Sequence, residues 1–239
     1  MEKAHQESYE GHKITVYYED DDYFNPRTYG DNVSKIICVE QTRYIIGDDV
    51  KINFQSLDDI MEYIDEQNPL VVKPVYVYEH GGVTISTEPF SCRWDSGQIG
   101  YAFVTKESMK GMGFKDDDIN TKKASEIIDM EIEEYDHYLK GEVYRWEIDY
   151  PGDYDSCGGY IGNLDDCIKD ARGAINCHIN ANKNARNKIP ECAWEMVAEV
   201  NIRYVCPYCN DVFDDSKGLI EHMKEAHAQA VLNEINRIS

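Results

Sequence analysis

The sequence predicts an α+β fold in which helices pack on a mixed or antiparallel sheet, with a small metal-binding module at the C-terminal end. Hydrophobic residues make up 42% of the 239 residues, a globular composition. Strand-like and helix-like segments follow one another irregularly and not as βαβ units, which favours α+β over a doubly wound sheet. The last forty residues hold two cysteines and two histidines at regular spacing.

The first elements are predicted from alternation and capping. Residues 13–18 alternate and are rich in β-branched side chains, which predicts a strand. Residues 34–46 predict one or two more strands. Ser56 and Asp59 form a capping-box pattern at the start of a helix, and Pro69 ends that helix. Its apolar residues recur at helical spacing: Leu57, Ile60, Met61 and Ile64.

The middle of the chain predicts a hairpin, a strand and a short helix. Residues 70–78 predict a buried strand, and Gly81-Gly82 turns the chain into residues 83–86. Residues 99–105 predict a further strand. Residues 109–114 predict a short helix that glycines interrupt.

Two long helices complete the predicted fold. The first begins at Thr121 as its cap and runs to about Leu139. Residues 142–149 alternate again and predict a strand, followed by a Gly-rich turn. Asn163 caps a second helix that runs to about Asn187. The first helix has an inward stripe of Ala124, Ile128, Ile132, Tyr135 and Leu139.

Pro190 marks the predicted domain boundary. We expect an α+β main domain over 1–189, a connecting segment over 190–203, and a zinc finger with an extended C-terminal helix over 204–239.

The C-terminal cysteines and histidines predict a zinc site. Cys206, Cys209, His222 and His227 follow the spacing C-x2-C-x12-H-x4-H, which suits a tetrahedral Zn²⁺. Two cysteines on a tight turn and two histidines about one helical turn apart can converge on one ion. Phe213 and Leu219 are expected to form the small core between hairpin and helix.

Residues 204–229 resemble the C2H2 zinc-finger family. In that family three helix positions contact bases, and here they fall on Asp215, Gly218 and Glu221. Two acids and a glycine are a poor set for a phosphate-rich duplex. We therefore expect a structural or protein-docking finger, with direct binding of duplex DNA disfavoured.

The main domain carries a second resemblance. Asn25-Pro-Arg27, Tyr44-Ile-Ile-Gly-Asp48 and Pro89-Phe-Ser-Cys-Arg-Trp-Asp-Ser-Gly-Gln98 occur in one order, and Glu134-Tyr-Asp136 and Asp155-Ser-Cys157 follow. Over residues 13–175 this set resembles a family of bacteriophage and prophage proteins of uncharacterised function. Those proteins often have proline where this chain has Arg93. The resemblance implies a viral origin and no particular activity.

The charge balance limits the partners. The chain has 46 Asp and Glu against 24 Lys and Arg, so its formal net charge is −22. Such a chain is repelled by phosphate backbones and attracts basic proteins. With no apolar run long enough for a membrane span and no signal core, we expect a cytoplasmic protein, in the host cytoplasm if viral.

Two classes of function follow. The favoured one is an accessory protein that binds a basic or nucleic-acid-handling host protein, defence enzymes included, with carboxylates standing in for phosphates. These carboxylates lie on the helix from Thr121 to Leu139: Glu126, Asp129, Glu131, Glu133, Glu134 and Asp136.

The alternative is an enzyme with Cys92 as nucleophile, His80 as base and Asp95 nearby. Arg93 would then help to form the thiolate. We favour the structural alternative, in which Cys92 and Trp94 are core residues and Asp95-Ser96-Gly97 forms a turn, so that the chain is not an enzyme. Nucleic-acid binding through the finger is a weaker third possibility.

Overall fold

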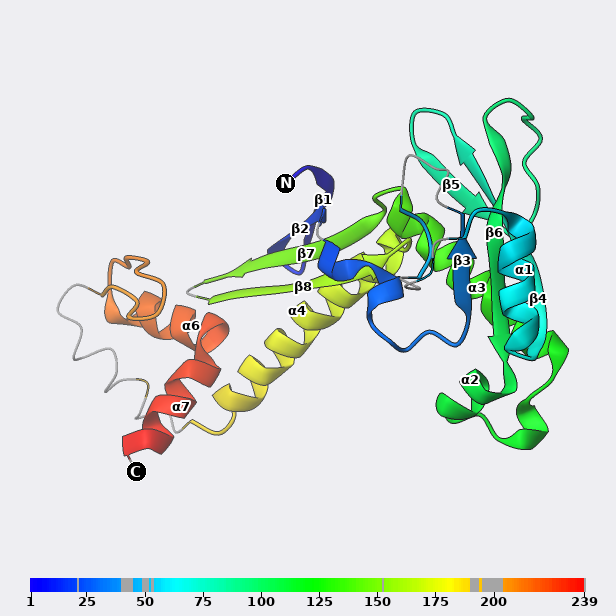
Figure 1. The fold of residues 1–239 in the computed structure, drawn as a ribbon. Coiled ribbons are helices and arrows are strands. Elements are labelled where there is room, and N and C mark those ends of the chain that lie inside the picture. Colours follow the sequence, from blue (N-terminus) through cyan, green and yellow to red (C-terminus); the bar gives the residue numbers. More distant parts are fainter. Residues whose placement is uncertain are drawn as a thin grey trace. The chain divides into compact units, whose positions relative to one another are not determined.

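The protein is an α+β fold, as the sequence predicts, with two four-stranded antiparallel sheets and packed helices (Figure 1). It is described here by a computed structural model over residues 1–20, 22–39, 45–48, 52, 54–151, 153–189, 194 and 204–238. The predicted connecting segment, 190–203, lies outside these residues except for Trp194.

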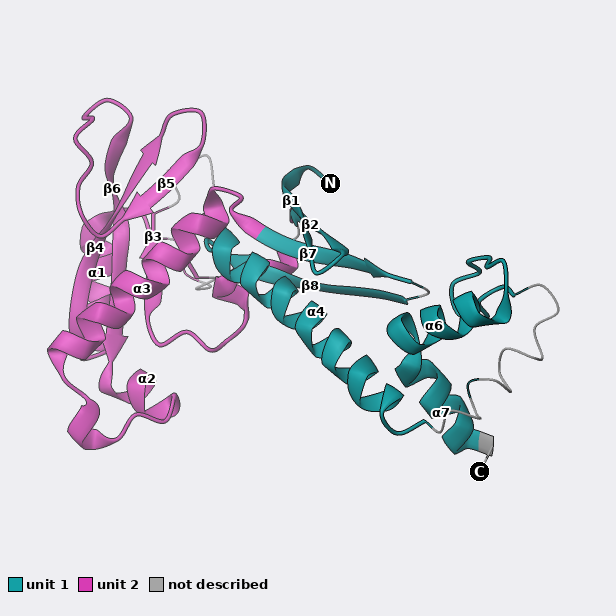
Figure 2. Ribbon diagram, turned by 180° about the vertical axis from the view of Figure 1, so that it is seen from behind, with its two compact units in different colours: residues 1–18, 144–239 teal, residues 19–143 magenta. Residues whose placement is uncertain are grey.

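The chain forms two compact units (Figure 2). Unit 1 combines residues 1–18 with 144–239, and unit 2 is the continuous stretch 19–143. The contacts thus divide the stretch 1–189, which the sequence analysis treats as one main domain, between two units.

Unit 1 contains the sheet β1-β2-β7-β8. Its strands are β1 (Lys3–Tyr9), β2 (His12–Tyr18), β7 (Val143–Tyr150) and β8 (Asp153–Ile161). The pairs β1–β2 and β2–β7 are antiparallel. β1 was not predicted from the sequence, and β8 lies where a Gly-rich turn was expected.

The long helix α4 (Leu164–Arg186) packs on one face of this sheet. Its N-cap is Asn163, as predicted, whose side chain accepts a hydrogen bond from the Asp166 amide. Alternation along the strands directs one set of apolar side chains toward the helix. The core they share contains Ile14, Val16, Tyr144, Trp146, Ile148, Tyr150, Cys167, Ile168, Ala171 and Ile175.

Unit 2 contains the sheet β3-β6-β4-β5, in which all neighbours are antiparallel. Its strands are β3 (Lys35–Cys38), β6 (Ser96–Thr105), β4 (Pro69–Glu79) and β5 (Val83–Ser86). At Gly100 of β6 an added Cβ would overlap the Ile37 carbonyl oxygen, so β3 can approach this closely only because residue 100 is glycine.

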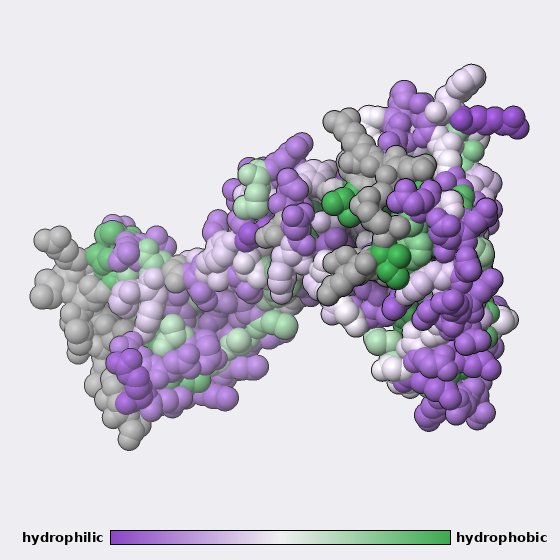
Figure 3. Space-filling view, viewed as in Figure 1, coloured by the Kyte–Doolittle hydropathy of each residue, from purple (hydrophilic) through white to green (hydrophobic). Residues whose placement is uncertain are grey.

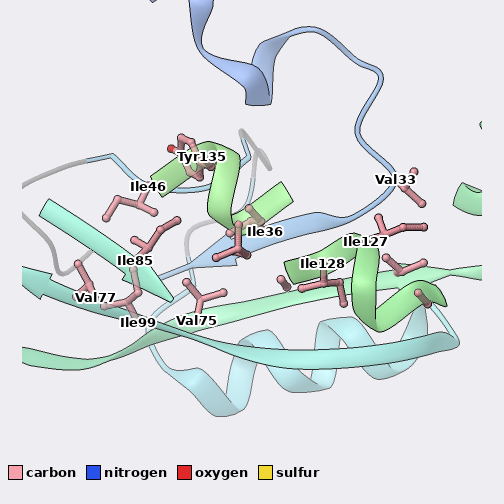
Figure 4. Packing of buried hydrophobic residues seen from close by; sticks show 14 of the residues in the cluster. Val33, Ile36, Ile46, Val75, Val77, Ile85, Ile99, Ile127, Ile128 and Tyr135 are labelled. Carbon is pink, nitrogen blue, oxygen red and sulfur yellow. The ribbon is translucent and has the colours of Figure 1, made fainter. Parts of the chain in front are cut away.

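Helices cover both faces of this second sheet. The helix α3 (Thr121–Leu139) packs on the face that includes Ile36, and α1 (Leu57–Glu66) packs on the face that includes Ile37. Figure 4 shows the α3 side, where Val75, Ile85 and Ile99 of the sheet form one cluster with Ile127, Ile128 and Tyr135 of α3. Adjacent residues of one strand thus belong to two separate cores.

Helix starts differ slightly from the sequence predictions. Ser56 caps α1 as expected, but the side chain that caps α3 is that of Asn120. The short helix α2 (Lys106–Gly111) begins earlier than predicted because Thr105 and Ser108 form its capping box. Three single-turn 3-10 helices, η1 (Asp22–Phe24), η2 (Pro26–Thr28) and η3 (Asp116–Asp118), complete unit 2.

Arg27 connects two of the motifs quoted above. Its side chain is 2% exposed, and its five N–H groups make five hydrogen bonds. Two go to Asp48 and one each to Asn32, Glu131 and the Ser34 carbonyl. Motif residues far apart in sequence therefore form one buried network that ties η2 and β3 to α3.

Candidate metal centre

The C-terminal module, residues 204–238, begins with a small knuckle. Val205 and Val212 form an antiparallel bridge. Between them the Asn210 amide donates to the Cys206 carbonyl at 2.9 Å, and Asn210 takes a left-handed conformation with φ of 64°. This tight turn brings the Cys206 and Cys209 thiols to the same side of the module.

Two helices follow the knuckle. The helix α6 (Ser216–Ala226) carries His222 and ends at His227 as its C-cap, and α7 (Ala228–Ile238) begins immediately afterwards. The single extended C-terminal helix that the sequence analysis expected is therefore divided. Because the division falls at His227, the imidazole of that residue lies at a helix junction.

The four residues predicted as ligands converge. One potential ligand atom from each of Cys206, Cys209, His222 and His227 lies within 4.8 Å of the others. The Cys209 Sγ and His222 Nε2 atoms are 3.1 Å apart. In the described part of the chain this is the cluster of such residues that could hold a metal ion.

Burial prepares the His227 imidazole for a metal. This residue is 5% exposed, and its buried Nε2 has no hydrogen-bond partner. Burial and the neighbouring His222 lower the pKa of His227 to about 4, so the ring is neutral at neutral pH, the form that binds metals. A buried ring nitrogen without a partner is costly, and a metal ion would satisfy it.

The protonation of the Cys209 thiol also depends on whether a metal ion is bound. Burial raises the pKa of Cys209 to about 12 in the absence of a cation. A bound cation would reverse this shift, because thiols coordinate metals as thiolates.

The module packs against the end of α4. Its core contains the candidate ligand Cys206, the predicted core residue Leu219 and, from α4, Ala185. Phe213, also predicted, packs at its edge. The buried Asn182 side chain of α4 donates to the Ala226 carbonyl and accepts from the Gln229 amide, so it joins α6 and α7. Figure 1 shows both helices beside this half of α4, in contact with it.

One of the positions that would read bases is engaged within the protein. The Asp215 carboxylate caps α6 by accepting a hydrogen bond from the Gly218 amide at 2.8 Å. Glu221 is half-exposed and lies 3.9 Å from Arg186 of α4, a long contact. Asp215 is therefore not freely available to accept a hydrogen bond from cytosine.

The structure brings His80, Cys92 and Asp95 together in a loop region of unit 2. Asp95 Oδ2 lies 3.3 Å from His80 Nδ1 and 3.8 Å from Cys92 Sγ. The carboxylate thus stands next to both the thiol and the imidazole. It does not provide the cationic neighbour that favours a reactive thiolate.

The alternative core reading of this loop is wrong for Trp94, which is 95% exposed. Cys92 is half-buried. Gly97 belongs to β6 and not to a turn, and the Ser96 hydroxyl donates to the Cys92 carbonyl. The local sequence around Trp94 contains no pattern that indicates whether this side chain is buried or exposed.

The acidic face of α3 is partly neutralised, because two of its six carboxylates, those of Glu131 and Asp136, are each only 13% exposed. Glu131 belongs to the Arg27 network, and Asp136 accepts from the Ile85 amide. Asp129 contacts Lys73 on β4. Asp129 is nevertheless exposed, as are Glu126, Glu133 and Glu134.

Comparisons of the chain with family models, curated proteins and solved structures found no match. The resemblance to bacteriophage proteins therefore stays a prediction. None of the described helices combines the length and apolar character that crossing a membrane requires.

Proposed function

We propose that this chain is a zinc-binding protein and that its C-terminal module is a C2H2 finger with a structural role. The observation that carries the proposal is the convergence of Cys206, Cys209, His222 and His227 on one point. Two thiolates with two imidazoles form the closed, tetrahedral donor set typical of structural zinc. In that role the metal supplies folding free energy to a module too small to fold on its own core.

The packing supports a structural role over base reading. Of the three base-reading positions, Asp215 is engaged as a helix cap and Gly218 has no side chain with which to contact a base. The −22 net charge also opposes approach to a phosphate backbone.

Metal analysis of freshly purified protein tests the proposal. We expect one Zn²⁺ per chain, lost in Cys206→Ser and retained in Cys177→Ser, which removes an exposed thiol outside the cluster. Replacement by Co²⁺ should give the absorption bands of tetrahedral coordination. Protein that contains no zinc, or variants that retain equal metal, would contradict the proposal.

We further propose that the protein acts by binding a basic host protein, in the manner of a viral accessory factor. The distribution of charge supports this idea. Unit 2 has 27 Asp and Glu against 12 Lys and Arg, and so holds −15 of the net −22. The face seen in Figure 3 is mostly hydrophilic, in keeping with recognition by charge.

The exposed α3 carboxylates give this second proposal a test. Affinity capture from host lysate identifies the partner, and association kinetics then compare the wild type with the triple variant Glu126→Gln, Glu133→Gln, Glu134→Gln. Long-range attraction acts mainly on the association rate, so the variant should associate more slowly at low salt and approach the wild-type rate as salt rises. Equal rates at low salt, or direct binding of duplex DNA at physiological salt, would show that the acidic surface has no such role.

A further inference from the structure

Unit 1 contains a cleft that the proposed zinc site does not use. It has a volume of about 280 Å³ and lies where α4 passes the start of β2 and the end of α6. We call it the basic cleft and define it by six of its lining residues: His12, His178, Asn182, Lys183, Arg186 and Lys224.

The basic cleft concentrates positive charge in an acidic chain. Three Lys or Arg side chains line it, against one acid among the described residues, Glu225. Lys183 forms no ion pair with the described part of the chain, and Arg186 meets Glu221 only at 3.9 Å. The positive charges of Lys183 and Arg186 are therefore largely uncompensated, in a protein where acids outnumber bases by almost two to one.

Neutral side chains, held in place by contacts with their neighbours, lie beside Lys183 and Arg186 in the basic cleft. The Asn182 side chain is bonded to His178 Nε2 at 2.9 Å, and the His178 ring stacks on Tyr150 with centroids 4.0 Å apart. Burial lowers the pKa of both His12 and His178, so each is a neutral imidazole with one N–H at neutral pH. The wall of the basic cleft is thus held in place before any ligand arrives.

We propose that the basic cleft binds the phosphate group of a small phosphorylated molecule, with Lys183 and Arg186 as the charged contacts. Arg and Lys are the usual side chains for phosphate, and arginine can form paired hydrogen bonds to its oxygens. The volume is slightly below that of typical drug-sized pockets, which suits a phosphate ester or pyrophosphate.

Calorimetric titration of the full-length, zinc-loaded chain at low salt tests this proposal. The probes are inorganic phosphate, pyrophosphate, a nucleoside monophosphate and a single-stranded oligonucleotide. Because α6 forms one wall, the proposal rests on the folded module of the proposed function. Zinc content is therefore measured in every sample, so that a chain without metal is distinguished from a folded chain that does not bind phosphate.

A matched pair of double variants locates the site. Lys183→Gln with Arg186→Gln should weaken binding of pyrophosphate or the nucleotide about tenfold or more, a factor that corresponds to about 1.4 kcal/mol. Lys169→Gln with Lys188→Gln removes the same charge from exposed positions outside the basic cleft and should leave affinity unchanged.

Three results would overturn the proposal. The first is zinc-loaded protein that binds none of the small probes at millimolar concentration. The second is an equal loss of affinity in both double variants, which would indicate general charge attraction. The third is binding confined to the oligonucleotide, which would make the basic cleft a contact for a nucleic-acid backbone.

Discussion

Arg27 shows how one residue can hold a unit together. All five of its N–H donors are used, and two of its partners, Asp48 and Glu131, are carboxylates with 20% and 13% exposed side chains. Glu131 also accepts from the Val33 and Ser34 amides. Removal of the guanidinium would leave two carboxylates close together with no cation to balance them.

We expect Arg27→Met to destabilise unit 2 by about 3–5 kcal/mol, because breaking a buried pair strands the remaining charges. Lys73→Met is the control, since its pair with Asp129 is more exposed and should contribute less than about 1 kcal/mol. Urea unfolding of both variants measures the difference. Equal losses would mean that the Arg27 network adds no more than a surface ion pair.

Glu134 predicts a pH dependence in the same region. Partial desolvation of this otherwise exposed side chain, with the nearby charges of Glu131 and Asp31, raises the pKa of Glu134 above its ordinary value. A raised carboxyl pKa means that ionisation costs stability in the folded state. This cost is fully present above the folded pKa and disappears as pH falls below the unfolded pKa.

Glu134→Gln should therefore raise the urea midpoint at neutral pH, and the gain should shrink toward about pH 4, where an ordinary carboxyl is half protonated. The comparison variant is Glu133→Gln, an exposed neighbour on α3. A gain that stays constant with pH would point to helix propensity and not to the relief of a charge.

At the scale of elements, the proposed zinc module is joined to α4. Ala185 and Ile189, from the end of α4 and just beyond it, lie in the same core as Leu219 and Met223 of α6. Asn182 holds the α6–α7 junction from the α4 side. Loss of the metal should therefore loosen more than residues 204–229.

Chelation should accelerate amide hydrogen exchange in the last turns of α4 as well as in α6 and α7, because opening of one packed cluster exposes all its members. The sheet β3-β6-β4-β5 should keep its protection. Hydrogen exchange with mass spectrometry, with and without chelator, checks both. Unchanged exchange in residues 182–189 would show that α4 holds its structure without the module.

The sequence predicted most elements because their signals are local. Alternation located β2 and β7, an apolar run typical of a buried strand located β4, and caps located α1 and α4. In contrast, β8 has six exposed residues in succession and two glycines, so it shows neither alternation nor β-propensity.

The same distinction holds for the sites. The spacing of Cys206, Cys209, His222 and His227 in the sequence is enough to identify a possible metal site. The Arg27 network and the basic cleft join residues from distant segments, which one sequence cannot pair.

At the scale of the whole molecule, unit 2 is an insertion between two paired strands. Tyr18 at the end of β2 is the register partner of Tyr144 in β7. The ladder extends one residue further, since the Glu19 amide donates to the Val143 carbonyl at 2.9 Å. Where the chain leaves unit 1 and returns to it, the two strand ends are paired in antiparallel register, as they are next to the turn of a β-hairpin.

Replacement of residues 20–142 by Asn-Gly should therefore give a folded unit 1 that binds one zinc, and residues 20–142 alone should fold without zinc. Asn-Gly suits the positive φ values of a two-residue hairpin turn, and Val-Val in its place is the control, which should be less stable. Thermal unfolding and metal analysis measure both. If the shortened chain fails to fold even with zinc supplied, unit 1 depends on unit 2.

The insertion also sets an order of events during synthesis. The hairpin β1–β2 emerges first, yet its partner β7 begins only at Val143, the last of the 125 residues from 19 to 143. An isolated hairpin is marginally stable, so β1 and β2 have no stable sheet to join until β7 has been synthesised. Unit 2 is continuous and can fold as it emerges. Once folded, unit 2 holds Glu19 and Val143 within hydrogen-bond distance. The entropic cost of bringing the two ends of this segment together, on the order of 4 kcal/mol, is then already offset by the folding of unit 2. The inserted unit thereby acts as a scaffold that delivers β2 to β7 as the rest of the chain is made.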